Sequence, residues 1–165
     1  MAKKSIKTEE TQRKNSTILV AVDFSPYSAL ALRKARSMVR EKSDGILALH
    51  VVDQDFVKSC VLNALGEEKD IRQKLFLRAK KKLKNFLDHE GMVGEGVDKL
   101  ICEGIPYLEI NRQAVLNDVE MIVMGSRGNS GDMNSIFFGS TTERVLRFIK
   151  RPVLCVPQEE INKST

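Results

Sequence analysis

Short, uninterrupted apolar runs are the feature that most constrains the fold of this chain. Residues 17–22 (TILVAV) are typical: the run is too short for a helix and too continuous for a strand with one face in water. Runs at 46–52, 121–124 and 153–156 have the same character, and 97–102 (VDKLIC) resembles a further strand. Runs of this kind are typical of buried parallel strands. We therefore expect five strands.

Segments with helical periodicity separate these strands. Ser25 is a good N-cap and Pro26 suits a first helical position, so a helix is predicted from 26 to about 42. Further helices are predicted at 67–89, 107–117 and 141–150, while 53–66 has no clear period and is expected to be a loop or partly helical. The apolar stripe expected for the helix at 107–117 is Leu108, Ile110 or Ala114, and Val115. Strands and helices then alternate strictly. This order favours a single doubly wound, mostly parallel five-stranded α/β sheet, Rossmann-like, with helices on both faces.

Composition narrows the class of protein. With 165 residues, 42% hydrophobic and 30% charged, the chain suits one compact domain. It contains no apolar run of about 18 residues, and its N-terminal residues are polar, so we expect a soluble cytoplasmic protein without membrane contact. Three widely spaced cysteines and two histidines favour neither a disulfide framework nor a structural zinc site.

The net charge of +5 is distributed unevenly. Residues 1–15 carry five basic and two acidic side chains, so this tail alone contributes +3. We divide the chain into a basic tail (1–15), one domain (16–158) and a C-terminal tail (159–165). A second basic run, RAKKKLK at 78–84, falls on a predicted helix. It is interpreted as a solvated helix face, since nucleic-acid binding would favour interleaved aromatic residues.

A glycine-rich loop at 125–140 follows the fourth predicted strand and precedes a helix. Its glycines are Gly125, Gly128, Gly131 and Gly139. Glycine allows positive φ and a close backbone approach to a ligand, and a helix N-terminus attracts anions, so the loop is a candidate phosphate site. The alternative is a loop shaped only by its glycines, with Ser140 and Glu143 forming an ordinary capping box. The two roles are compatible.

Asp23, at the carboxyl end of the first strand, faces the crevice where ligands bind in such sheets. It is a candidate acceptor for a nucleotide base or ligand for Mg²⁺, or else a turn residue paired with Ser25. Arg127 could pair with phosphate or remain an exposed loop arginine. His50, inside the second strand, is interpreted as a packed residue. Neither a P-loop nor a hydrolase triad can be assembled, so no catalytic residue is assigned.

Four segments together resemble the universal stress protein family over 18–157. They are ILVAVDFS at 18–25, LALHVVD at 47–53, EGIPYLEINRQA at 103–114, and MIVMGSRGNSG with FFGSTTERVLR and PVLCVP. The resemblance implies an adenine nucleotide alpha hydrolase-like fold and a site for ATP, or ADP or AMP, with Mg²⁺ or Mn²⁺ carried by the nucleotide. The residues it implies as binding are Asp23, Val51, Met124, Gly125, Arg127, Gly128, Gly139, Ser140 and Thr141.

The glycine loop departs from the family pattern in one respect. In nucleotide-binding members, nine residues separate the two glycines that correspond to Gly128 and Gly139. Ten residues separate them in this chain. Two outcomes are open: the extra residue forms a bulge near 132–134 and leaves the N–H groups of 139–141 in place, or it disrupts the phosphate site.

The resemblance also implies a homodimer in which the fifth strands, Val153–Val156, pair at their edges.

The sequence leaves three candidate functions. The first is a regulatory module that binds ATP in a stress response, without rapid turnover. The second is a slow Mg²⁺-dependent ATPase that uses Asp23. The third is a protein that binds no nucleotide and engages an acidic partner through its basic surface.

Overall fold

The computed structural model describes residues 16–41, 43–63, 66–92, 94, 96–128 and 138–157. The strands are β1 (Thr17–Ala21), β2 (Gly45–Asp53), β3 (Val97–Gly104), β4 (Met121–Gly125) and β5 (Val153–Val156). The helices are α1 (Pro26–Met38), α2 (Gln54–Leu62), α3 (Glu68–His89), α4 (Pro106–Leu116) and α5 (Ser140–Arg147). Both tails and the middle of the glycine loop lie outside the described residues, so the bulge at 132–134 stays a prediction.

The strands form one sheet in the order β3-β2-β1-β4-β5, and every neighbouring pair is parallel. The chain runs outward from β1 through β2 to β3, and then returns to the other side of β1 with β4. The direction of winding therefore reverses between β1 and β4. In sheets of this kind the crevice at the carboxyl ends of these two strands is where ligands bind. The predicted five-stranded α/β sheet is confirmed.

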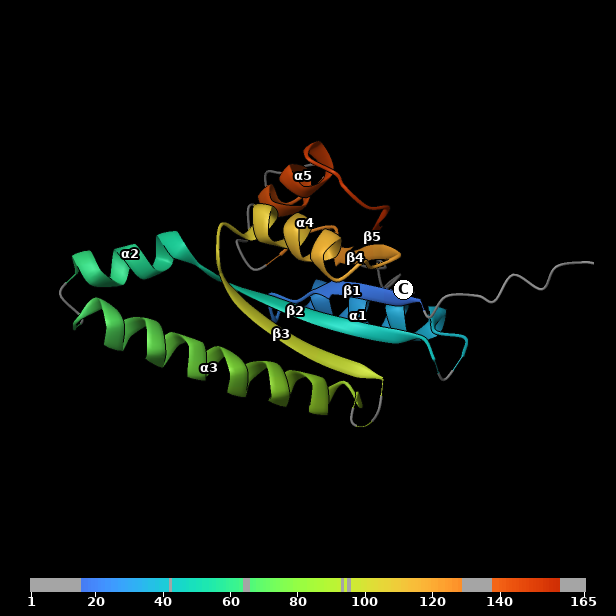
Figure 1. The fold of residues 1–165 in the computed structure, drawn as a ribbon, viewed down its shortest axis with the longest axis horizontal. Coiled ribbons are helices and arrows are strands. Elements are labelled where there is room, and N and C mark those ends of the chain that lie inside the picture. Colours follow the sequence, from blue (N-terminus) through green and yellow to red (C-terminus); the bar gives the residue numbers. More distant parts are fainter. Residues whose placement is uncertain are drawn as a thin grey trace, which may run out of the picture.

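Helices cover both faces of the sheet (Figure 1). Side chains of α1 and α3, such as Leu32 and Leu83, pack on one face with Val20 of β1. On the other face, Ile110 of α4 and Val145 of α5 pack with neighbouring strand residues. Because the inner strands β1, β2 and β4 are covered on both sides, their residues are apolar in succession rather than alternately. The continuous runs in the sequence are thus explained by the layers.

Helix α1 begins as predicted and ends earlier. The Ser25 side chain accepts a hydrogen bond from the backbone N–H of Ser28 at 3.2 Å, and proline occupies the first turn. The helix ends at Met38 instead of about residue 42. The buried carboxylate of Asp44 accepts the N–H groups of Arg40 and Glu41, both at 3.2 Å. This turn satisfies donors that would otherwise extend the helix, so the predicted end was wrong.

Two other helices differ from their sequence-based descriptions. The stretch without a clear period contains α2, which packs with α3 through Val57 and Ile71, so two helices separate β2 from β3 and strict alternation was wrong. In α4 the expected apolar stripe included Leu108 and Val115, which are 45% and 47% exposed. The expected Ile110 and Ala114 are buried, and the rest of the buried face consists of the polar residues Asn111 and Gln113.

Candidate functional site

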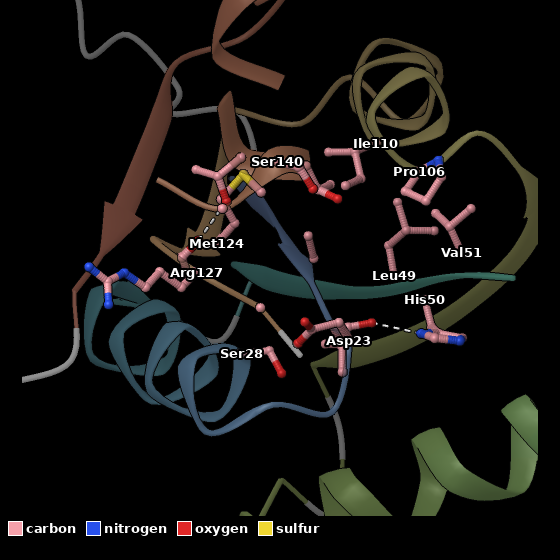
Figure 2. Close-up of a pocket in the computed structure, with 17 residues that line it drawn as sticks. Asp23, Ser28, Leu49, His50, Val51, Pro106, Ile110, Met124, Arg127 and Ser140 are labelled. Carbon is pink, nitrogen blue, oxygen red and sulfur yellow. Dashed lines mark hydrogen bonds between the residues drawn. The ribbon is translucent and has the colours of Figure 1, made fainter. Parts of the chain in front are cut away.

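One cavity lies at the carboxyl ends of β1 and β4, where the winding of the sheet reverses (Figure 2). Its volume is ≈ 250 Å³, near the lower end of small-molecule pockets, which begin at about 300 Å³. Residues from β1 and the turn after it, α1, β2, β4, α4, α5 and the glycine loop line it. The cavity is therefore built by segments that are far apart in the sequence and meet only in the folded sheet.

One end of the cavity is apolar. Leu49 and Val51 of β2 line it together with Pro106 and Ile110 of α4, and these four side chains gather on one side in Figure 2. Met124 of β4 adds a polarisable thioether to the lining. A flat, largely apolar group such as a nucleobase fits a surface of this kind, since its faces seek apolar contact and its edge can reach backbone groups of the strand.

The other end is polar, and Asp23 lies at its centre. Asp23 follows β1, and its Oδ1 accepts hydrogen bonds from the backbone N–H of Ser25 at 3.0 Å and from the Ser25 hydroxyl at 2.5 Å. Its Oδ2 lies beside the glycine loop, 2.5 Å from the position that a Cβ on Gly128 would take. The sequence left open a turn role or a ligand role for Asp23. The structure shows the turn contacts and also places the carboxylate in the pocket lining.

The loop glycines are required by close packing. A Cβ on Gly125 would lie 2.6 Å from Tyr27 Cβ, so α1 can approach β4 only because residue 125 lacks a side chain. A Cβ on Gly139 would lie 3.3 Å from the Cα of Arg127, where the two ends of the loop meet. Positive φ angles are found at other glycines, such as Gly91 and Gly94, and not at these. These glycines therefore allow close packing between protein segments and do not adopt positive φ, while the expected close approach to a ligand stays a prediction.

The start of α5 corrects the predicted capping box. The N-cap is Gly139 rather than Ser140, and no side chain caps the helix. The N–H of Gly139 donates to the Ser126 carbonyl at 2.9 Å, so it is not available to a ligand. Within the described residues, the N–H groups of Ser140 and Thr141 have no backbone acceptor. The anion-binding potential of this turn therefore rests on Ser140 and Thr141.

Thr142 anchors this turn to the sheet. Its side chain is 3% exposed and donates a hydrogen bond from Oγ1 to the Gly125 carbonyl at 3.0 Å. The first turn of α5 is thereby tied to the carboxyl end of β4. The sequence-based site omitted Thr142, and the S-x-x-E pattern drew attention to Ser140 and Glu143 instead. Glu143 pairs with Arg147 on the exposed side of the helix.

His50 borders the cavity from β2. Its Nδ1 lies 2.7 Å from the Val22 carbonyl, which can only accept, so Nδ1 carries the proton. Burial lowers the pKa of His50; the hydrogen bond to Val22 opposes this, Lys82 adds to the lowering and Asp23 counters it. A neutral imidazole with a fixed tautomer results at neutral pH. The interpretation of His50 as a packed residue missed its place in the lining.

All nine residues proposed as binding from the sequence line this one cavity. Of these nine residues, Arg127 has the weakest case for a binding role, because its guanidinium points away from Asp23 and His50 in Figure 2. Besides Thr142, the proposed set omitted Pro106 and Ile110, which form the wall opposite the sheet. The order of the chain did contain a signal for them, since the first turn of α4 follows the carboxyl end of β3, at the ligand-binding edge of the sheet.

Other chemistry has little support among the described residues. They contain no group of three His, Cys, Asp or Glu side chains able to hold a metal ion. The three cysteines are free thiols, and burial, reinforced by Glu109, raises the pKa of Cys102 to about 11, so this thiol stays protonated at neutral pH. No helix in the described part of the chain is long and apolar enough to span a membrane.

The basic run at 78–84 lies on α3 and is divided between core and surface. Ala79 and Leu83 are buried, whereas Arg78, Lys80 and Lys81 are exposed. Lys82 is exposed as well, but its Nζ also lies 4.4 Å from the centre of the Phe24 ring. Most of the charge in this run therefore faces solvent, as the sequence indicated.

Comparisons with known proteins agree with this fold. The universal stress protein family model matches residues 14–157. The curated universal stress protein MJ0577 of Methanocaldococcus jannaschii is 32% identical over 154 residues, covering 86% of this chain and 94% of the relative. A solved structure of MJ0577 has a TM-score of 0.75 and covers 89% of this chain and 99% of that one.

More distant relatives extend the comparison. Universal stress protein YxiE of Bacillus subtilis is 30% identical over 144 residues, covering 84% of this chain and 97% of the relative. A solved universal stress protein in complex with cAMP is 16% identical with a TM-score of 0.54, covering 88% of this chain and 98% of that one, which is a likeness of fold. With the family model spanning nearly all described residues, the chain belongs to the universal stress protein family.

Proposed function

We propose that this protein binds an adenine nucleotide, ATP in the first place, and serves as a regulatory module without rapid turnover. The observation that carries this proposal is the convergence of segments far apart in the sequence on one cavity with an apolar end and a polar end. The two ends match the two halves of a nucleotide, a base with apolar faces and an anionic chain of phosphates. Membership of the universal stress protein family supports the same function.

The residues present fit this ligand. The base would lie between Val51 and Ile110. The ribose would lie near Asp23, whose carboxylate can accept a hydrogen bond from a hydroxyl group. The phosphates would lie along Gly128 and the first turn of α5, where a side chain at residue 128 would fill the space beside Asp23. The N–H groups of Ser140 and Thr141, together with the positive end of the helix dipole, would contact the anion.

A divalent cation would accompany the phosphates. Because no cluster of three ligating side chains exists among the described residues, the nucleotide itself would supply most of its ligands. Asp23 is the described carboxylate in the lining that could contribute an oxygen. The cation would neutralise phosphate charge and leave the protein groups to orient the chain.

Binding without hydrolysis is favoured by the state of the Asp23 carboxylate. One of its oxygens accepts two hydrogen bonds from Ser25, which holds the carboxylate in a fixed orientation. His50 is held in place by the hydrogen bond that its Nδ1–H donates to the Val22 carbonyl. Bound ATP would therefore act by its presence, changing the stability or the partner choice of the protein.

The test begins with nucleotide carried through purification. Denatured protein should release adenine nucleotide, identified by mass spectrometry, and calorimetry of nucleotide-free protein should show binding of Mg·ATP that GTP does not match. Asp23→Ala should weaken the affinity about tenfold or more, since a hydrogen bond to a charged group is lost. Lys74→Gln, on the exposed side of α3, is the matched control. Absence of both released nucleotide and a calorimetric signal would refute the proposal.

Hydrolysis is measured on the same samples. Phosphate release at the buffer background, with ATP bound at one site per chain, is the expected result. Release above background that disappears in Asp23→Ala would instead identify a slow ATPase.

We further propose that the protein is a homodimer paired through β5. β5 stands at one end of the sheet, with β4 as its neighbour in the described chain. All four of its residues are half-buried, so its edge is not protected by charge or by a covering segment among the described residues. An open edge of this kind is a template for another strand, and a second copy of β5 would satisfy it.

The alternation of backbone groups along β5 gives a sharp test. The carbonyls of Pro152 and Val156 accept hydrogen bonds from Ile122 of β4 and from Ser126 directly after it. Cys155, one position out of phase, therefore presents its N–H to the open edge. Cys155→Pro removes that outward donor and leaves the contacts with β4 intact. Light scattering should show a dimer for the wild type and for Cys155→Ala, and a monomer for Cys155→Pro. A monomeric wild type would refute the proposed dimer.

A further inference from the structure

Phe24, directly after Asp23, adopts a backbone conformation that is rare for its residue type. Its φ is +66°, in the left-handed region, and one other non-glycine residue in the described chain, Asp118, has a positive φ. A side chain with a Cβ is disfavoured there, and a bulky residue remains in this region only where its surroundings hold it. The contacts of the Phe24 side chain should therefore explain why the conformation persists.

Three side chains surround the Phe24 ring. The imidazole of His50 lies 4.3 Å from it between centroids, and the ring of Phe86 meets it edge-on at 5.7 Å. The ammonium of Lys82 lies 4.4 Å from the ring centre, in cation–π geometry. These groups come from β2 and α3, two elements that are separate from the turn itself. The ring is thus clamped by residues outside its own segment.

The conformation of Phe24 determines where the Asp23 carboxylate lies. With residue 24 left-handed, the chain folds back so that Asp23 Oδ1 reaches both the N–H and the hydroxyl of Ser25. The opposite oxygen, Oδ2, then lies beside Gly128 in the pocket lining. Phe24 itself is absent from that lining, so its effect on a ligand would pass through Asp23.

His50 holds the same turn from its other side. While its ring packs on Phe24, its Nδ1 donates to the carbonyl of Val22 at 2.7 Å. The residues immediately before and after Asp23 are therefore both fixed by one side chain of β2. This arrangement links α3, through Lys82, to the position of a carboxylate in the cavity.

We propose that Phe24 is a positioning residue whose clamped ring maintains the turn that holds the Asp23 carboxylate at the nucleotide site. The proposal rests on the proposed function in so far as it concerns nucleotide affinity. Its structural part, the dependence of the turn at Asp23 on the Phe24 ring, can be measured without any ligand.

Phe24→Gly tests the proposal, because glycine accepts the left-handed backbone but removes the clamped ring. In a double-mutant cycle with Asp23→Ala, Phe24→Gly should weaken Mg·ATP affinity about tenfold in the wild-type background and less than about twofold in the Asp23→Ala background. Phe24→Tyr, which keeps the ring, should retain wild-type affinity. Equal losses in both backgrounds would indicate general damage to the fold and would overturn the proposal.

A second readout separates this proposal from the nucleotide assignment. The Ser25 N–H donates to Asp23 Oδ1, so its hydrogen exchange without nucleotide reports the turn directly. Phe24→Gly should raise that exchange rate about tenfold, whereas Phe24→Tyr should leave it unchanged. If the wild type binds no nucleotide and Ser25 exchange still rises, the proposed function fails and the positioning role stands. Unchanged Ser25 exchange in Phe24→Gly would overturn the positioning role.

Discussion

Gly125→Ala should lower the stability of the protein without requiring any ligand. The new Cβ would lie 2.6 Å from Tyr27 Cβ and 2.9 Å from both the Tyr27 carbonyl carbon and the Arg127 carbonyl oxygen. Ordinary carbon contacts lie at about 3.5–4.0 Å, so the shortest of these is about 1 Å too close. None of the three atoms can rotate away by a change of rotamer. The backbones of α1 and β4 must therefore separate.

The expected cost is that of overpacking a tight core, about 3 kcal/mol. For a chain of this size, that corresponds to a fall in Tm of about 6–12 °C. Thermal and urea denaturation of nucleotide-free protein measure it. Gly139→Ala is the matched control from the same loop, because its closest contact would be 3.3 Å and a shift of a few tenths of an ångström relieves it. Its cost should stay near or below about 1 kcal/mol.

Two results would refute this explanation of the glycines. A Tm for Gly125→Ala within about 2 °C of the wild type would mean that α1 and β4 tolerate the added methyl group. An equal loss in Gly125→Ala and Gly139→Ala would mean that the contact distances do not determine the cost. If Gly125→Ala kept the stability of the wild type but lost ATP binding, residue 125 would be glycine because of the ligand and not because of packing.

Three further predictions follow from contacts at the site. Gly128→Ala should displace the Asp23 carboxylate, whose Oδ2 lies 2.5 Å from the added Cβ, and should weaken Mg·ATP affinity measured by calorimetry in the wild-type background but not in Asp23→Ala. Thr142→Val removes the buried hydrogen bond to the Gly125 carbonyl and should reduce the free energy of unfolding in urea by about 1 kcal/mol, with Thr142→Ser retaining most of the stability. Because the pKa of His50 is lowered in the folded protein from its ordinary 6.5, the unfolded chain binds the proton more readily, and stability should decrease as the pH falls through 6.5 toward the folded pKa. His50→Gln should reduce this pH dependence in denaturation curves measured between neutral and mildly acidic pH, and an unchanged slope would show that His50 is not its source.

The strands and the position of the site could be predicted from the sequence. The inner strands β1, β2 and β4 are largely buried, so each appears as a continuous apolar run that is visible without knowledge of its neighbours. Alternation of strands with helices implied a parallel sheet, and the carboxyl ends of its strands indicated Asp23 and the loop after β4. Ser25 and Pro26 marked the start of α1 because capping depends on residues only a few positions apart.

Helix α4 shows where this kind of inference fails. Leu108 and Val115 were expected to face the core, but the buried face includes Asn111 and Gln113. The Asn111 amide donates to the carbonyls of Tyr107 and Val145, and Val145 belongs to a helix 34 positions away. A distant segment thus helps to satisfy the amide nitrogen of this buried residue, while its Oδ1 has no partner among the described residues. No periodicity in α4 itself contains that information.

What the sequence by itself determined was the set of buried strands, their parallel arrangement and the edge of the sheet at which a ligand would bind, because these depend on the local pattern of apolar residues and on short turns. Only the tertiary structure explains the residues that shape the site. Gly125 is glycine because of Tyr27, and Phe24 keeps its turn because of groups on β2 and α3. Such contacts join residues that are distant along the chain, so their energies exist only once the layers have packed.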